Sequence, residues 1–103
     1  MIRACIDTQA LTLDVTGHAE FGNVGQDIVC AAASMLGYTL LARLREISGV
    51  EYAHADSGCM TIRAAECRDE DVRRSMREAF ETVRAGFALL AHQYPENVET
   101  TCK

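Results

Sequence analysis

The sequence predicts an α+β fold, a two-layer sandwich in which two helices cover a mainly antiparallel sheet. Two long segments repeat apolar residues at helical spacing, and four short segments alternate apolar and polar residues as strands do. Their order along the chain is ββαββα, and the tail can add a final strand. A chain of 103 residues can bury a core of its own, so we expect one domain over residues 1–103.

The four strand segments are expected to form two hairpins. In the second segment Leu11, Leu13 and Val15 alternate with polar residues, which is the period of a half-buried strand. Residues 8–10 form the first turn, and Ser57–Gly58 is a turn pair between the other two segments. The predicted strands are residues 1–8, 11–17, 50–56 and 59–65, with 97–103 as a short edge strand.

The first helix is predicted over Ile28–Ile47. Asp27 is a good N-cap, because its carboxylate can accept hydrogen bonds from the free amides of the first turn. The helix is apolar on most sides as far as Leu41, which indicates a central, covered helix. Gly37 costs about 1 kcal/mol relative to Ala inside a helix, so a close contact with a neighbouring element is expected there. Gly49 is a plausible stop.

The second helix is predicted over Asp69–Tyr94. Acidic residues crowd its start, where they suit the helix dipole, and Pro95 ends it. One clean apolar stripe at helical spacing should face the sheet. Its members are Val72, Met76, Ala79, Phe80, Val83, Phe87, Leu90 and Tyr94.

The charge balance limits the classes of partner. The formal net charge is −5, and the basic residues form no dense cluster. Binding to nucleic acid requires concentrated positive charge to neutralise phosphates, so we expect no direct nucleic-acid contact. An acidic surface favours cationic partners and disfavours anionic membranes. No apolar run reaches membrane-spanning length without a charged residue or Gly, so no membrane partner is expected.

The cysteines indicate a reducing compartment. Their number is odd, no two have CxxC spacing, and the N-terminus does not resemble a signal peptide. We therefore expect free thiols and a cytoplasmic location. Neither cysteines nor histidines pair locally, so no metal site and no cofactor are expected. The five residues are Cys5, Cys30, Cys59, Cys67 and Cys102.

Cys30 and His18 are the candidate catalytic residues. Cys30 lies three residues after the cap, in the first helical turn, where the dipole and free amides favour a thiolate. His18 follows the second strand, across a loop of small residues, and its imidazole could meet the sulfur. The first-turn amides could also hold the oxyanion of a tetrahedral intermediate. Together these features predict an acyl-transfer site.

Structural readings of the same residues stay open at this point. Cys30 lies in an apolar run, and a free cysteine usually serves as a small core residue. His18 can be a solvated or capping loop residue, and Asp27 can be only an N-cap. Ser34 lies one turn beyond Cys30 on the same helix face and can be a small packing residue or can orient the sulfur.

The segment around these residues resembles the bacterial ribosomal-processing cysteine proteases. The string GHA at Gly17–Ala19 and the string GQDIVCAAAS at Gly25–Ser34 match the pattern of that family, with the same separation of His and Cys. The resemblance implies a small α+β homodimer. It also implies that the protein removes a short N-terminal extension from a large-subunit ribosomal protein, cutting after a hydrophobic peptide that ends in an aromatic residue.

The resemblance also implies roles for individual residues. Cys30 would be the nucleophile and His18 the general acid and base, acting as a dyad because no third acidic member is evident. Asp27 and Ser34 would support the site. The loop from Ala19 to Gly25 would be mobile and would become ordered around the substrate. The residues expected to contact the substrate are Gly17, Ala19, Gly22, Gly25 and Phe21, whose ring could contact an aromatic residue of the substrate.

Two other functions remain as alternatives. A non-catalytic ribosome-associated binding module could keep the same fold, but it would have no need for both His18 and Cys30. A redox-active thiol protein could cycle Cys30 through sulfenic acid. That activity would benefit from a second cysteine within disulfide reach of Cys30, and none is close in sequence.

Overall fold

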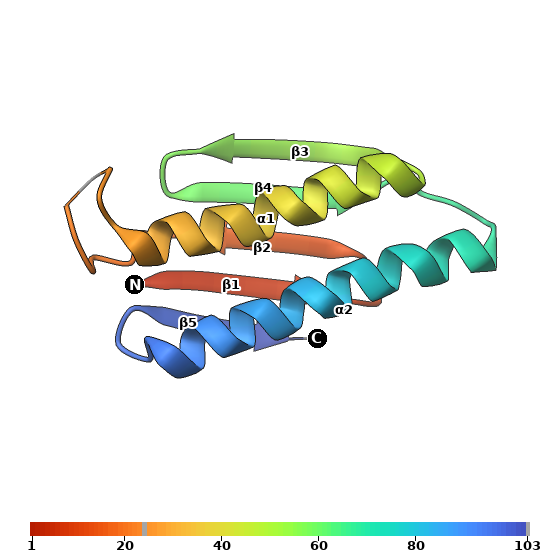
Figure 1. Cartoon of the computed structure of the whole chain (residues 1–103). Helices are drawn as coiled ribbons and strands as arrows, with labels where there is room; N and C mark the ends of the chain where they lie inside the picture. Colours follow the sequence, from red (N-terminus) through yellow and green to blue (C-terminus); the bar gives the residue numbers. More distant parts are fainter. Residues whose placement is uncertain (24, 103) are drawn as a thin grey trace.

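The computed structural model, which describes residues 1–23 and 25–102, confirms the predicted fold class (Figure 1). Each predicted element is present, and the second helix is one residue shorter at each end than predicted, because Asp69 and Tyr94 are its caps. The tail forms the final strand. The elements are β1 (Ile2–Asp7), β2 (Thr12–Thr16), α1 (Ile28–Ile47), β3 (Val50–Asp56), β4 (Cys59–Ala64), α2 (Glu70–Gln93) and β5 (Val98–Cys102).

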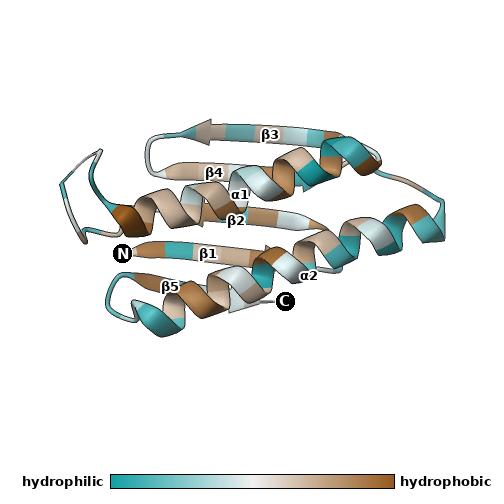
Figure 2. Cartoon of the chain, viewed as in Figure 1, coloured by the Kyte–Doolittle hydropathy of each residue, from teal (hydrophilic) through white to brown (hydrophobic). Residues whose placement is uncertain are grey.

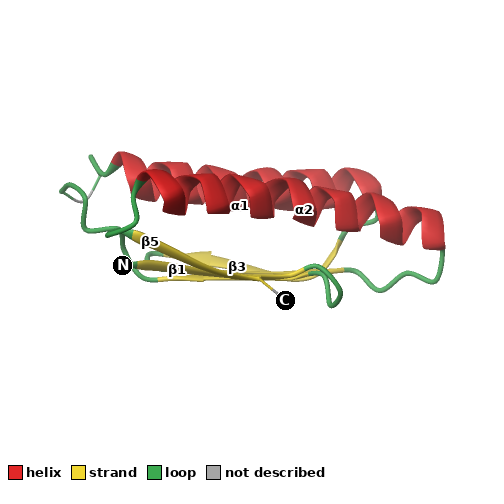
Figure 3. Ribbon diagram, turned by 90° about the horizontal axis from the view of Figure 1, so that it is seen from below, coloured by secondary structure: helices red, strands yellow, loops and turns green. Residues whose placement is uncertain are grey.

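The five strands form one sheet in the order β3-β4-β2-β1-β5. Neighbouring strands are antiparallel except for β1 and β5, which run parallel because α2 carries the chain back across the sheet. Both helices lie on the same face of the sheet, which leaves the other face uncovered by helices (Figure 3). The sheet is therefore mainly antiparallel, as predicted.

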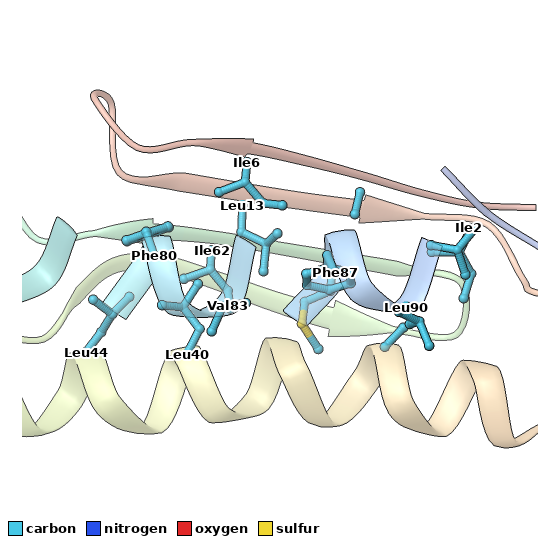
Figure 4. Close-up of a cluster of buried hydrophobic side chains, with 14 of the residues drawn as sticks. Ile2, Ile6, Leu13, Leu40, Leu44, Ile62, Phe80, Val83, Phe87 and Leu90 are labelled. Atoms are coloured by element: carbon cyan, nitrogen blue, oxygen red, sulfur yellow. The ribbon is translucent and has the colours of Figure 1, made fainter. Parts of the chain in front are cut away.

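The core lies between the helices and the sheet (Figure 4). In β1 the residues Ile2, Ala4 and Ile6 are buried while their neighbours in sequence are not, as expected where one strand face packs on the core. From α2 the core receives the inner part of the predicted stripe, and Phe80 and Phe87 are completely buried. The buried residues of this helix are Met76, Phe80, Val83, Phe87 and Leu90.

The predicted close contact at Gly37 is confirmed. A Cβ atom at this position would lie 2.1 Å from Sδ of Met60, a buried residue of β4. The absence of a side chain at Gly37 thus lets α1 approach the sheet above Met60.

The outer face of α1 is not covered within the chain, so one chain alone does not provide the predicted cover of this helix. Ile28, Met35 and Tyr38 are 60%, 65% and 48% exposed. Figure 2 shows the first turns of α1 in brown to pale colours, whereas α2 alternates between teal and brown along its length. By length and composition α1 could also cross a membrane, a test that the core helix of a folded domain passes as well. In this structure its inner face, including Leu40 and Leu44, is part of the core.

Candidate active site

The first turn of α1 is tied to the preceding loop through one carboxylate. Asp27 is the N-cap, and its Oδ1 accepts hydrogen bonds from the amides of Val29 (2.9 Å) and Cys30 (3.0 Å). Its Oδ2 accepts from the amides of Phe21 (2.9 Å) and Gly22 (3.1 Å) in the loop. Asp27 thus caps the helix and also fixes the loop to it.

These hydrogen bonds hold the pKa of Asp27 below its usual range. The bond from the Cys30 amide has the largest effect; desolvation opposes it, and the amides of Gly22, Phe21 and Val29 lower the pKa further. A group whose pKa falls on folding stabilises the folded state above its unfolded pKa of about 3.9, and this contribution is lost as the pH falls through the folded pKa.

We therefore expect wild type to resist urea better than Asp27→Asn at pH 7, and this difference to be smaller at about pH 2.5, below the unfolded pKa of about 3.9. Urea midpoints measured by circular dichroism at the two pH values test this. A difference of equal size at both pH values would show that the charge of Asp27 does not stabilise the fold.

The cap leaves few helix amides for an oxyanion. The amides of Val29 and Cys30 donate to Asp27, and the Ala31 amide donates to the Asp27 backbone carbonyl at 3.0 Å. Among the described residues this leaves the Ile28 amide as the first-turn donor without a hydrogen bond. Two of the amides that the sequence suggested for an oxyanion are thus occupied.

Cys30 is half-buried, and its sulfur accepts a hydrogen bond from the loop. The donor is the amide of Ala19, which lies 3.3 Å from Sγ. Ala19 is only 1% exposed, so this amide is shielded from water. An N–H group in this position is a hydrogen-bond donor to the atom that would act as the nucleophile. The residue before this donor is His18.

Backbone hydrogen bonds fix the segment Gly17–Ala19 against its neighbours. The Gly17 amide donates to the Gly58 carbonyl at 2.9 Å, which ties the end of β2 to the β3–β4 hairpin. The amino group of Met1 donates to the His18 carbonyl. The segment therefore spans the space between the hairpin and the start of α1.

The His18 ring lies against the hairpin. A Cβ atom on Gly58 would be 2.7 Å from Nε2 of His18, so the ring can occupy this position only because residue 58 is a glycine. Within residues 1–23 and 25–102 no hydrogen bond joins the ring to the sulfur of Cys30. Catalytic hydrogen bonds are often long or unformed before substrate binds, so a rotation of the exposed side chain would be needed to reach the sulfur.

A cavity of about 480 Å³ contains both candidate catalytic residues. Its lining residues come from the loop with the start of α1 and from the β3–β4 hairpin. Ile2, Val15 and Met60 provide apolar surface at the sheet. Of the residues selected from the sequence, the cavity is lined by Gly17, His18, Gly22, Gly25, Asp27, Cys30 and Ser34.

Two of the selected loop residues do not line this cavity. Ala19 is buried behind it and contributes its backbone. Phe21 is 49% exposed and packs edge-to-face on Tyr94 at the end of α2, with ring centroids 5.2 Å apart. Val24, which belongs to the predicted substrate loop, lies outside the described residues.

The structure adds residues that the sequence analysis did not select. Gly58 was interpreted only as a turn residue, yet the His18 ring rests on it. Tyr38 and Asp56 line the cavity from α1 and the hairpin. Asn97 donates through Nδ2 to the Ala19 carbonyl at 2.8 Å, across 78 positions of sequence. Nothing local in the sequence marks these residues, because their roles depend on contacts between distant segments.

The comparison with known families agrees with this geometry. The profile of a family described as "Cysteine protease Prp" matches residues 1–99. The chain belongs to this family. The protein is therefore a cysteine protease, as the sequence predicted, and the resemblance to ribosomal-processing proteases is confirmed at the level of the Prp family.

Individual relatives support the assignment to the Prp family. The ribosomal processing cysteine protease Prp of Bacillus subtilis (strain 168) is 25% identical over 103 residues, which is 97% of this chain and 92% of that protein. The crystal structure of SMU.848 from Streptococcus mutans has a TM-score of 0.74 and 31% identity, and the match covers 99% of this chain and 93% of that one. The essential ribosomal processing protease Prp from S. aureus, in complex with a covalently linked product peptide, has the same fold. Its TM-score is 0.82 at 22% identity over the full length of both chains.

The thiols and acidic groups give no support to the redox alternative or to a metal site. Cys5, Cys30, Cys59 and Cys67 are free cysteines. Cys59 lines the cavity, but the alternation of β4 places its side chain on the opposite sheet face from Met60, away from α1. In the part of the chain that the structure describes, no three His, Cys, Asp or Glu residues form a group that could hold a metal ion.

Proposed function

We propose that this protease acts in the cytoplasm and removes a short N-terminal extension from a large-subunit ribosomal protein, with Cys30 and His18 as its catalytic dyad. The observation that carries the proposal is the placement of both residues on one cavity, with an amide directed at the Cys30 sulfur. The name of the B. subtilis relative supports the ribosomal substrate. The proposed cut follows a hydrophobic segment that ends in an aromatic residue.

In the proposed mechanism the Cys30 thiolate attacks the scissile carbonyl carbon and forms a carbon–sulfur bond. The Ala19 amide, which already points at the sulfur, is a donor that can shift its hydrogen bond to the oxyanion. His18 protonates the leaving amine as the peptide C–N bond breaks. Water activated by His18 then hydrolyses the thioester and returns the thiolate.

The charges of the cavity suit a basic protein substrate. Glu20, Asp27 and Asp56 are among its lining residues, and no Lys or Arg is among those described. The whole chain has a formal net charge of −5. Opposite charges on enzyme and substrate raise the rate of encounter, and this effect weakens with salt. We also propose that the protease does not bind nucleic acid directly, because the same negative charge disfavours contact with phosphates.

The direct test is incubation of the host's full-length ribosomal protein with wild type and with Cys30→Ala, followed by intact mass spectrometry. We expect wild type to remove a single N-terminal fragment and Cys30→Ala to leave the protein intact. Cys67→Ala, which replaces a cysteine outside the cavity, is the matched control and should cleave like wild type. Absence of cleavage by folded, reduced wild type would refute the substrate assignment.

We further propose that the protein is a homodimer through the outer face of α1. The exposed residues Ile28, Ala31, Met35, Tyr38 and Ala42 follow the 3,4 spacing of a coiled-coil seam. The helix carries no charged residue before Arg43. Such a seam is self-complementary across a two-fold axis, so a second copy of α1 is its best-matched occupant.

Met35→Glu should convert a dimer into a monomer of 11.3 kDa, because each two-fold contact would bury two carboxylates. Light scattering after size exclusion measures the mass. Leu89→Glu is the matched control, since Leu89 is 58% exposed on α2, and it should remain dimeric. A stable homodimer has a dissociation constant well below about 50 µM. A wild-type protein that is still monomeric at this concentration would therefore exclude this interface.

A further inference from the structure

The amide that contacts the Cys30 sulfur is itself held from a distant element. The Ala19 amide points at Sγ, and the carbonyl of the same residue accepts a hydrogen bond from Nδ2 of Asn97 at 2.8 Å. Ala19 is 1% exposed, and the next residue, Glu20, has a φ of +58°, so the chain turns away directly after this point. The orientation of the amide therefore depends on where its carbonyl is fixed.

Asn97 is a rigid support because its own backbone is held at both ends. It lies in the short turn between α2 and β5, close to the start of β1 and the loop in Figure 1. Its amide donates to the Tyr94 carbonyl at 3.0 Å, and its carbonyl accepts from the Ile2 amide at 2.8 Å. These bonds involve only the backbone, so they survive substitution of the Asn97 side chain.

The other supports of the segment Gly17–Ala19 come from backbone groups. Gly17 is bonded to the Gly58 carbonyl, and the His18 carbonyl accepts from the amino group of Met1. Within the described residues, Asn97 is the side chain that donates to this segment. A side-chain substitution can remove this support alone.

From this arrangement we propose that Asn97 is a positioning residue for the reaction. Through Ala19 it holds the N–H group on the sulfur of Cys30, where the N–H stabilises the thiolate and then the oxyanion. The inference rests on the proposed role of Cys30 as nucleophile. It assigns to the turn before β5 a part in the chemistry of a loop 78 residues away in sequence.

The test compares Asn97→Asp and Asn97→Ala with wild type. Aspartate has nearly the same shape but lacks the N–H donor and places a second acceptor against the Ala19 carbonyl, whereas alanine removes the donor without adding charge. Gln93→Glu is the matched control for charge, because it adds a carboxylate on the exposed last turn of α2, four residues away. All variants are compared at a temperature where circular dichroism shows them fully folded.

Two measurements separate positioning from stability. The first is kcat and KM for a peptide that spans the proposed cleavage site. The second is the rate at which iodoacetamide alkylates Cys30 at pH 7, followed by mass spectrometry, which requires no substrate. Failure of the ribosomal protein as substrate would therefore leave the second measurement intact.

We expect kcat and the alkylation rate to fall about tenfold in both Asn97 variants, with KM within twofold of wild type, because a misplaced donor acts on the reacting atoms and not on peptide binding. Gln93→Glu should match wild type in all three quantities. The proposal is overturned if either folded Asn97 variant keeps wild-type kcat and alkylation rate. It is also overturned if Asn97→Asp and Gln93→Glu lose activity while Asn97→Ala does not, since the added charge would then account for the loss.

Discussion

Replacement of His18 by Ala should lower kcat for peptide cleavage by about 10³-fold, within the range typical for loss of a general acid–base residue. The imidazole lines the same cavity as Cys30, against Gly58 of the β3–β4 hairpin, and is the proposed donor to the leaving amine. Its side chain is exposed and is not part of the core, so KM and the thermal unfolding temperature should change little. Steady-state kinetics with the peptide and a thermal melt measure both.

His54→Ala is the matched control for this prediction. His54 is also exposed, but it lies in β3 opposite Thr61 of β4, on the sheet face away from the helices, and it does not line the cavity. This variant should keep wild-type kcat. If His18→Ala loses less than tenfold while Cys30→Ala is inactive, another group must protonate the leaving amine, and the dyad assignment is wrong.

The helices and strands could be predicted from the sequence because their determinants are local. Asp27 is followed directly by the segment it caps, and both of its predicted first-turn contacts form. The apolar stripe of α2 predicted which face of this helix is buried, because the spacing of apolar residues along one helix does not depend on the rest of the fold. The parallel pairing of β5 with β1 joins the two ends of the chain, and no local pattern encodes it.

The uncovered face of α1 shows where local patterns fail. An apolar helix must be covered by something, but its sequence does not say whether the cover belongs to the same chain. The sequence predicts a covered helix, and Met35 and Tyr38 are exposed within one copy of the chain. The same sequence feature now supports the proposed dimer.

In the candidate site, too, some residues could be predicted from the sequence and others could not. Cys30, His18 and Asp27 were selected because their types and spacing have chemical meaning, and the structure brings all three to one cavity. Asn97 and Gly58 could not be selected, because their importance depends on one contact each with the loop, from elements distant in sequence. Phe21 was selected for its aromatic ring, but that ring packs on Tyr94.

Gly17→Ala should destabilise the protein by about 2–4 kcal/mol and lower kcat more than 10²-fold, because overpacking, backbone strain and a displaced catalytic segment act together. Gly17 has a φ of +92°, which an L-residue rarely adopts. A Cβ atom there would also lie 2.2 Å from the Met1 carbonyl oxygen, a backbone atom that cannot rotate away. The clash can be relieved only by moving the start of β1 or the segment that carries His18 and the Ala19 amide.

Gly49→Ala is the control that separates the steric clash of a new Cβ atom from the backbone strain of a positive φ. Gly49 follows the C-terminal end of α1, does not line the cavity, and has a φ of +105°, but a Cβ atom there would meet no other atom within 4 Å. It should therefore show the cost of the strained backbone, about 1–2 kcal/mol, and retain kcat. Urea unfolding and peptide kinetics on both variants give the comparison. If the two variants lose the same stability and both keep full activity, then the contact of Gly17 with Met1 does not hold His18 in place, and the packing of β1 against this segment is not part of the active site.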